Sequence, residues 1–257
     1  MVVSEQRSHK RIDFHVHSKI SKRFRFSLQD FGNIVTQARR TGLDAFVLTE
    51  HFHIPDFWSI YDLLCQTYHY NEGLLELDDG FRILTGAELG VAEGCDLLLL
   101  GTLDQLSAFS QRLPASPVTG YKPYFEETVR VAHSCGVLLF GAHMFRLEKE
   151  LGKLGRVQLG SLDALELNGK DFLHDAAVRA EAEVLRLPVV GGSDAHFWLQ
   201  VGIKATSLPI EELTHRSVAQ AVAAGAGTVH SLPYGPMAVQ MSKAYKRLLK
   251  ASHKRAA

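Results

Sequence analysis

Seven short apolar segments recur along the 257-residue chain, and stretches with a helical pattern separate several of them. The segments, rich in β-branched residues or leucine, are Ile12–Val16, Ala45–Leu48, Phe81–Leu84, Leu97–Leu100, Val137–Phe140, Leu162–Leu167 and Pro188–Val190. Nearly continuous apolar strands are typical of sheets buried on both faces. Strands that alternate with helices form parallel βαβ units. The pattern therefore predicts an α/β fold with one closed or nearly closed barrel rather than two domains.

Helical periodicity is clearest in Leu28–Arg40, Phe125–Cys135 and Ala176–Leu187. Ser27 is expected to cap the first helix, and Thr41-Gly42 to end it. The proline- and glycine-containing stretch 105–122 predicts an irregular excursion, either a lid over the barrel mouth or, as we favour, a surface loop. We expect a tail over residues 1–10, the barrel over 11–240 and a basic helix or tail over 241–257.

Charge and cysteine content narrow the functional class. Lys plus Arg and Asp plus Glu both number 28, so the formal net charge is zero. No overall electrostatic field therefore favours binding to nucleic acid or to a membrane surface. The basic stretch 241–257 is either a solvated helix face or a contact for a polyanion. Three scattered cysteines indicate a reducing compartment, and no apolar run has membrane-spanning length. We expect a cytoplasmic protein that does not bind membranes.

Histidines and acidic residues gather at the ends of five apolar segments, where barrel proteins place their functional groups. Two histidines separated by one residue lie on the same face of a strand and can share one ion. The candidate ligands are His15, His17, His51, Glu88, His143, Asp194 and His196.

Each candidate alone has an ordinary explanation. A single histidine such as His51 or His143 is commonly a hydrogen-bonded polar residue, Glu88 can pair with an arginine, and Asp194 can cap a helix. Together they favour a metal centre. A ligand set of imidazoles and carboxylates that contains no thiolate suits Zn, Mn or Fe. There are more candidate ligands than one tetrahedral ion needs. The sequence therefore predicts two divalent ions, with a third left open.

These motifs, taken in order, resemble the PHP family (polymerase and histidinol phosphatase) over roughly residues 11–206. The matching segments are Asp13–Ser18, Thr49–His51, Gly86–Glu88, Gly141–Arg146 with Met144 in place of a proline, and Gly192–His196. Leu165–Asn168 also matches a strand of the family, with a structural role. The resemblance implies a distorted TIM-like (β/α)7 barrel of PHP type with up to three metal ions.

The resemblance also implies how the ligands are shared. One ion takes His15, His17, Glu88 and Asp194, a second shares Glu88 and takes His143, and a third takes His51 and His196.

Two departures from the family pattern concern the third ion. Lys22 and Arg23 stand where many members have an aspartate or histidine, and the fourth strand has no histidine, although Asp96 is a possible replacement. Our hypothesis is that Lys22 or Arg23 binds phosphate, with a solvated loop as the alternative. Arg146 can likewise hold phosphate oxygens or pair with a barrel carboxylate.

The predicted function is metal-dependent hydrolysis of a phosphate ester, most simply a phosphomonoester on a small metabolite. His196 or His51 is the candidate proton donor to the leaving group. The alternatives are a phosphodiesterase or exonuclease on nucleotides or short RNA, and a non-catalytic metal-binding module. Near-zero net charge and the lack of an evident aromatic stacking platform weigh against long polynucleotides.

Overall fold

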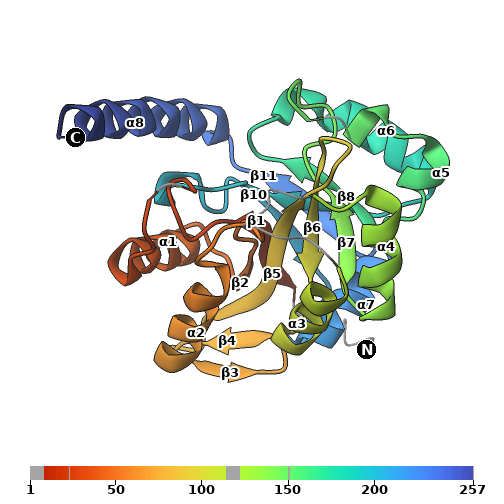
Figure 1. The fold of residues 1–257 in the computed structure, drawn as a ribbon, viewed down its shortest axis with the longest axis horizontal. Coiled ribbons are helices and arrows are strands. Elements are labelled where there is room, and N and C mark those ends of the chain that lie inside the picture. The colour runs from red at the N-terminus through yellow and green to blue at the C-terminus, as the bar shows by residue number, and fades with distance from the viewer. Residues whose placement is uncertain (1–8, 23, 114–121, 150, 257) are drawn as a thin grey trace, which may run out of the picture.

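The computed structural model describes residues 9–22, 24–113, 122–149 and 151–256. Its centre is a curved sheet in the strand order β11-β10-β1-β2-β5-β6-β7-β8-β9 (Figure 1). The predicted apolar segments correspond to β1 (Lys10–Val16), β2 (Ala45–Leu48), β5 (Arg82–Gly90), β6 (Asp96–Leu100), β7 (Leu138–Gly141), β8 (Ala164–Asn168) and β9 (Val189–Gly192).

The sheet closes between β1 and the segment that follows β9. Val16 and Ala195 form a parallel bridge. The His17 amide donates to the Ala195 carbonyl at 2.8 Å, and the Ala195 amide donates to the His15 carbonyl at 3.2 Å. The fold is therefore a mixed α/β, nearly closed barrel, and the predicted fold class is confirmed.

The direction of the fourth strand differs from the parallel order expected from the sequence. β6 runs antiparallel to both β5 and β7. A turn closed by the Val91 amide, which donates to the Cys95 carbonyl at 2.9 Å, joins β5 to β6. A parallel crossover needs a dozen or more residues, so this short connection requires the strand to reverse.

Four further strands were not predicted. β3 (His69–Asn71) and β4 (Leu74–Glu76) form a hairpin whose turn residues, Glu72 and Gly73, have φ values of 43° and 86°. β10 (Lys204–Leu208) pairs antiparallel with β1, and β11 (Thr228–Ser231) pairs with β10. These two strands extend the sheet beyond β1.

Helices cover the outside of the barrel, and the three predicted ones are present as α1 (Leu28–Arg40), α4 (Phe125–Ser134) and α6 (Asp175–Leu185). The Ser27 side chain caps α1 by accepting from the Asp30 amide at 3.3 Å. The other helices are α2 (Phe57–Thr67), α3 (Leu103–Arg112), α5 (Arg156–Leu159), α7 (His215–Ala223), α8 (Gly235–Ala256) and the 3₁₀ turns η1 (Leu151–Lys153), η2 (Phe172–His174) and η3 (Trp198–Gln200).

Helices α3 and α8 bear on two expectations: the irregular excursion over residues 105–122 and the basic C-terminal helix or tail from residue 241. The prediction of an irregular excursion from residue 105 is wrong up to Arg112, because α3 occupies this segment and is capped by Thr102. The rest of that stretch, residues 114–121, lies outside the described residues. α8 begins at Gly235 and continues past the expected boundary at 240. None of the helices that the structure describes is both long and apolar enough to cross a membrane.

Asp13 links the closing edges of the barrel from a fully buried position. One carboxylate oxygen accepts from the amides of His15 and Ser193 at 3.1 and 2.8 Å, and the other accepts from the Gly202 amide at 2.9 Å. These hydrogen bonds tie β1 to both ends of the loop after β9. Buried amides that lose their acceptor carry a desolvation cost.

Asp13→Ala is therefore expected to lower the free energy of unfolding by about 3 kcal/mol, because three buried N–H groups lose their acceptor. Urea denaturation followed by circular dichroism measures the change. Asp62→Ala, which removes an exposed carboxylate from α2, serves as the control with an expected change within about 0.5 kcal/mol. Equal effects of the two substitutions would contradict the role assigned to Asp13.

Candidate metal centre

His15 and His17 extend from the end of β1 into the space where the barrel closes. Their Nε2 atoms lie 3.1 Å apart, and both side chains are fully buried. Asp194, which follows β9, approaches the same point: its Oδ1 atom is 3.8 Å from His15 Nε2 and 3.6 Å from His17 Nε2. The three side chains form the first of three groups able to hold an ion.

Glu88 brings a second group together from β5. Its Oε1 atom lies 3.1 Å from His143 Nε2, and Asp96 Oδ2 lies 3.5 Å from the same nitrogen. Glu88, Asp96 and His143 are all buried and can converge on one cation. Asp96, left open by the sequence, is thus placed beside the predicted ligands, where it also forms an ion pair with Lys149.

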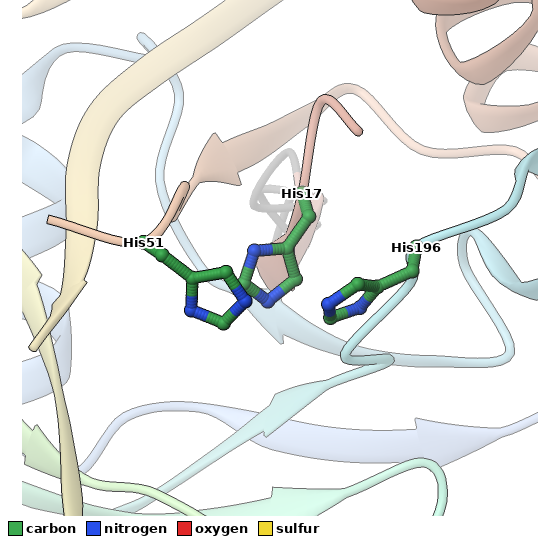
Figure 2. A group of neighbouring side chains, drawn as sticks. All are labelled: His17, His51 and His196. Atoms are coloured by element: carbon green, nitrogen blue, oxygen red, sulfur yellow. The ribbon is translucent and has the colours of Figure 1, made fainter. Parts of the chain in front are cut away.

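A third group consists of His17, His51 and His196, whose rings point toward one another from three separate segments (Figure 2). The ring centroids of His17 and His196 are 3.9 Å apart, and those of His17 and His51 are 4.4 Å apart. His51 is fixed beside Glu88 by a parallel bridge. Its Nδ1 atom lies 2.6 Å from Glu88 Oε2, so Glu88 and His17 each link two groups.

Glu166, on β8, orients two of these ligands. His15 Nδ1 donates to Glu166 Oε1 at 2.7 Å, which leaves His15 Nε2 as the nitrogen available to a metal ion. The His143 amide donates to Glu166 Oε2 at 3.0 Å. Gly192 makes this arrangement possible, because a Cβ there would lie 2.5 Å from both Glu166 Oε1 and His15 Cβ. The family-like strand around Glu166 therefore has a positioning role.

Unusual backbone conformations occur at two of the candidate ligands. His143 has φ 33° and Asp194 has φ 53°, the left-handed region that non-glycine residues rarely adopt. Such residues cost on the order of 1–3 kcal/mol each and cluster at functional sites. Asp194 caps no helix, since the next helical turn, η3, begins at Trp198 and has Phe197 before it. The helix-cap explanation of Asp194 is not supported.

The electrostatics of the site favour a bound positive charge. Burial alone would raise the pKa of Glu88, but His51, His143 and His15 hold it well below its usual range. Burial likewise opposes ionisation of Asp194, but Lys170 and His15, together with hydrogen bonds from His17 and His196, hold its pKa well below its usual range. Both carboxylates therefore stay ionised although they are buried.

The pKa of His15 is shifted by the neighbouring carboxylates. Burial disfavours its charged form, but the carboxylates of Glu166, Asp194 and Glu88 together raise its pKa to about 9. The pKa of His196 is lowered by burial and by the nearby His17 and Lys170. Burial also lowers the pKa of His51.

The donor atoms fit a group of divalent ions. Neutral imidazoles and ionised carboxylates are ligands of divalent ions, and the candidate ligand atoms in each group lie within 4.8 Å of one another. Nδ1 of His17 and Nδ1 of His143 are buried without a hydrogen-bond partner among the described residues. The arrangement is consistent with a multinuclear metal site.

Two cationic side chains border Asp194. Arg146 Nη2 lies 3.0 Å from Asp194 Oδ2 and 2.7 Å from Asp171 Oδ2. Of the two roles considered for Arg146, pairing with carboxylates is the one visible here, and phosphate binding stays a prediction. Lys170 Nζ lies 2.8 Å from Asp194 Oδ1 and 3.4 Å from His196 Nδ1. Lys170 was not identified from the sequence, because no local spacing marks it.

The remaining predicted substrate-binding residues lie in the loop after β1. Lys22 is exposed and close enough for its charge to contribute to the lowered pKa of His51. Arg23 lies outside the described residues. Their proposed contact with phosphate stays a prediction.

Comparisons with known proteins give the same picture of the fold. PsfC from Pseudomonas syringae PB-5123 has a TM-score of 0.81 and 25% identity, covering 94% of this chain and 99% of that one. The lesion-specific endonuclease Q from Pyrococcus furiosus has a TM-score of 0.68 and 20% identity, covering 86% of this chain and 58% of that one. Curated proteins give no match.

Residues 176–226 match the family described as PHP-associated. The chain is similar to PHP-associated proteins over this segment. Endonuclease Q in complex with a 27-mer duplex with an abasic lesion is similar in fold to this chain, with a TM-score of 0.65, 20% identity and coverage of 87% of this chain and 58% of that one. The chain thus spans little more than half of the endonuclease. The predicted PHP resemblance is confirmed over these residues, and the structure contains groups of histidine, aspartate and glutamate side chains that could hold metal ions.

Glu166→Gln is expected to weaken metal binding by about 10–100-fold, because the hydrogen bond that orients His15 loses its charge. Titration with Zn or Mn against a competing chelator measures the affinity. Glu181→Gln, at an exposed ion pair with Arg156, is the matched control and should bind as the unaltered protein does. An unchanged affinity in Glu166→Gln would contradict the positioning role.

Metal binding is expected to release a proton from His15 at neutral pH. With its pKa raised to about 9, this imidazole is protonated at pH 7 before metal binds and must lose the proton to become a ligand. Affinity should therefore rise with pH from 7 toward 9. Calorimetry in buffers of different ionisation enthalpy counts the protons released. An affinity independent of pH over this range would exclude the mechanism.

Proposed function

We propose that this protein is a metal-dependent phosphomonoesterase that acts on a small phosphorylated metabolite. The observation that carries the proposal is the junction of three ligand groups, two of them fully buried, through His17 and Glu88 at the closing edge of a PHP-type barrel. A non-catalytic module would need only one such group. Several groups within one site suit the clamping of a phosphate ester.

Zn, Mn or Fe are the ions we propose, two of them at the groups around Asp194 and around Asp96. The third group, His17, His51 and His196, supports a third ion despite Lys22 in the neighbouring loop. When bound, the ions supply a Lewis acid for phosphate oxygens and a water molecule of lowered pKa.

The protein's own side chains have distinct parts in the reaction. We propose that Arg146 and Lys170, both paired with Asp194, hold phosphate oxygens that enter the site; their position beside this candidate ligand supports the role. The lowered pKa values of His51 and His196 keep both rings neutral at pH 7. This supports metal binding by these two histidines over the proton-donor role considered from the sequence.

A second candidate function is hydrolysis of a nucleotide phosphodiester. The observation that favours it is a pocket of about 310 Å³ beside His196 whose lining includes Phe24, Phe197, Trp198 and Tyr245. Aromatic side chains of this kind can stack on a base. They provide an aromatic platform that the sequence did not reveal.

The cellular setting and the partners are also proposals. Cys65, Cys95 and Cys135 are free thiols, which supports a reducing, cytoplasmic location. We propose a small phosphorylated molecule as the partner, without a membrane.

His15→Ala and Asp194→Asn are expected to lower kcat/KM by about a thousand-fold, because each removes a ligand and several kcal/mol of charge stabilisation. The assay compares phosphomonoesters and phosphodiesters on protein loaded with Zn, Mn or Fe, with metal content measured in parallel. Asp104→Asn, an exposed residue of α3, is the control and should keep full activity.

The outcomes separate the candidate functions. Faster turnover of monoesters supports the first proposal, and faster turnover of diesters supports the second. Fewer than one bound ion and no turnover of either class would favour a non-catalytic module. Full activity after removal of all metal would reject both enzymatic proposals.

A further inference from the structure

Asn168, the last residue of β8, has a side chain whose two ends face groups of opposite charge. Its Nδ2 atom donates to both carboxylate oxygens of Glu166 at 3.0 Å. Its Oδ1 atom accepts from Arg146 Nη2 at 3.0 Å and from the Lys170 amide at 2.9 Å. Asn168 is 3% exposed, so these hydrogen bonds are shielded from water.

The partners determine how the carboxamide of Asn168 is oriented. An ionised carboxylate only accepts hydrogen bonds, and a guanidinium only donates them. Glu166 therefore requires the NH2 group, and Arg146 requires the carbonyl oxygen. Two other side chains of similar size cannot serve both partners, because aspartate lacks the donor and leucine lacks donor and acceptor alike.

The main chain at Asn168 is also fixed. The residue pairs with Gly192 between β8 and β9. Its carbonyl oxygen accepts from the Asp171 amide at 3.2 Å and from Lys204 Nζ at 3.3 Å. The buried Lys204 ammonium is held in turn by Asp175, whose Oδ1 atom lies 2.6 Å away. The carboxamide therefore extends from an anchored backbone.

The NH2 end of Asn168 holds the carboxylate that orients the first ligand group. Glu166 accepts from His15 Nδ1 at 2.7 Å and from the His143 amide at 3.0 Å. Because Asn168 donates to both oxygens as well, rotation of the carboxylate would break several hydrogen bonds at once. A buried carboxylate is stabilised by such donors, and fixing it also fixes the His15 ring.

The oxygen end of Asn168 holds the two cations proposed to bind phosphate. Arg146 Nε donates to Asp171 at 2.9 Å, and its Nη2 atom lies 3.0 Å from Asp194 Oδ2. The Asn168 oxygen is a third, uncharged partner of this guanidinium, and none of these contacts involves Nη1. Lys170 is tied to the same oxygen through its main chain.

A residue that only filled the barrel wall would not need this chemistry. The neighbouring buried positions of β8, Leu165 and Leu167, are apolar. A leucine at 168 would have a similar volume, and cores tolerate exchanges that conserve volume. A buried polar side chain is costly unless its hydrogen bonds are complete, as they are here.

We propose that Asn168 is a positioning residue that couples the carboxylate behind the metal ligands to the residues that hold phosphate. The inference rests on the proposed phosphoesterase function and adds to it a residue that acts only through its neighbours. The Nδ2 atom acts on His15 through Glu166. The Oδ1 atom acts on phosphate through Arg146 and the Lys170 amide.

Two substitutions separate the two ends of the side chain. Asn168→Asp keeps an acceptor for Arg146 but places a second carboxylate against Glu166. Its affinity for Zn or Mn, measured against a competing chelator, should fall at least about tenfold. Asn168→Leu removes both ends, so its metal affinity should fall and its KM for p-nitrophenyl phosphate at saturating metal should rise, each about tenfold. The rise in KM should be smaller in Asn168→Asp.

A double variant distinguishes positioning from a structural role. Arg146→Lys keeps the charge but loses the planar fork that Asn168 orients. Adding Asn168→Leu to Arg146→Lys should raise KM by less than Asn168→Leu does alone, because part of its effect acts through Arg146. The full factor in the double variant would indicate independent, structural effects and would overturn the inference.

The matched controls are Asn71→Asp and Asn71→Leu, which alter an exposed asparagine that also ends a strand, β3. Both should keep the metal affinity and KM of the unaltered protein. Thermal melting confirms that each variant folds. If Asn168→Leu does not fold, Asn168→Asp decides, and an unchanged metal affinity in it overturns the inference.

Unchanged metal affinity and KM in Asn168→Leu would overturn the inference while phosphoesterase activity stands, and so would equal losses in the Asn71 variants. If the unaltered protein hydrolyses no ester, the proposed function fails, and calorimetric binding of inorganic phosphate to the metal-loaded proteins replaces KM. Weaker phosphate binding in Asn168→Leu then supports the inference. Equal binding in both proteins, or none in the unaltered protein, overturns it.

Discussion

The backbone hydrogen bonds that join His15 and His17 to Ala195 are the constraint on which the rest of the site depends. They fix the register between the end of β1 and the segment after β9. Because side chains alternate along an extended strand, a slip of one residue would turn both histidines away from Asp194. Closing the barrel and assembling the ligands are therefore the same structural event.

Closing the barrel buries several ionised carboxylates close together, and their negative charge must be balanced by positively charged groups. Glu88, Glu166 and Asp194 are buried together with His15, and burial of an ionised carboxylate is costly unless it is paired. The imidazoles supply part of the pairing, and Arg146 and Lys170 supply more at Asp194. The raised pKa of His15 shows that this field retains a positive charge at neutral pH. The same field attracts a divalent cation.

The strands of the barrel were largely predictable, but their directions were not. Burial on both faces makes each strand nearly continuous in apolar residues, whichever way it runs. For β6 the only local sign of reversal was the short connection from Gly90 to Asp96. α3 was missed although Thr102 and Gln105 form a capping box, because the prolines that follow indicated a loop. β11 is short and largely exposed, so it lacks an apolar signal.

The candidate ligands could be identified from the sequence because the spacing of His15 and His17 follows the two-residue period of a strand. The residues that orient the ligands or shift their pKa values are distant in sequence. Glu166 meets His15 across 151 positions. Lys170 acquires its place only when the end of β8 packs beside Asp194. α8 illustrates the limit most clearly. Its basic composition is plain in the sequence, but a solvated face and an anion site have the same composition. The stacking of Tyr245 on Phe197 sets the middle of α8 beside His196, a neighbourhood that composition alone does not reveal.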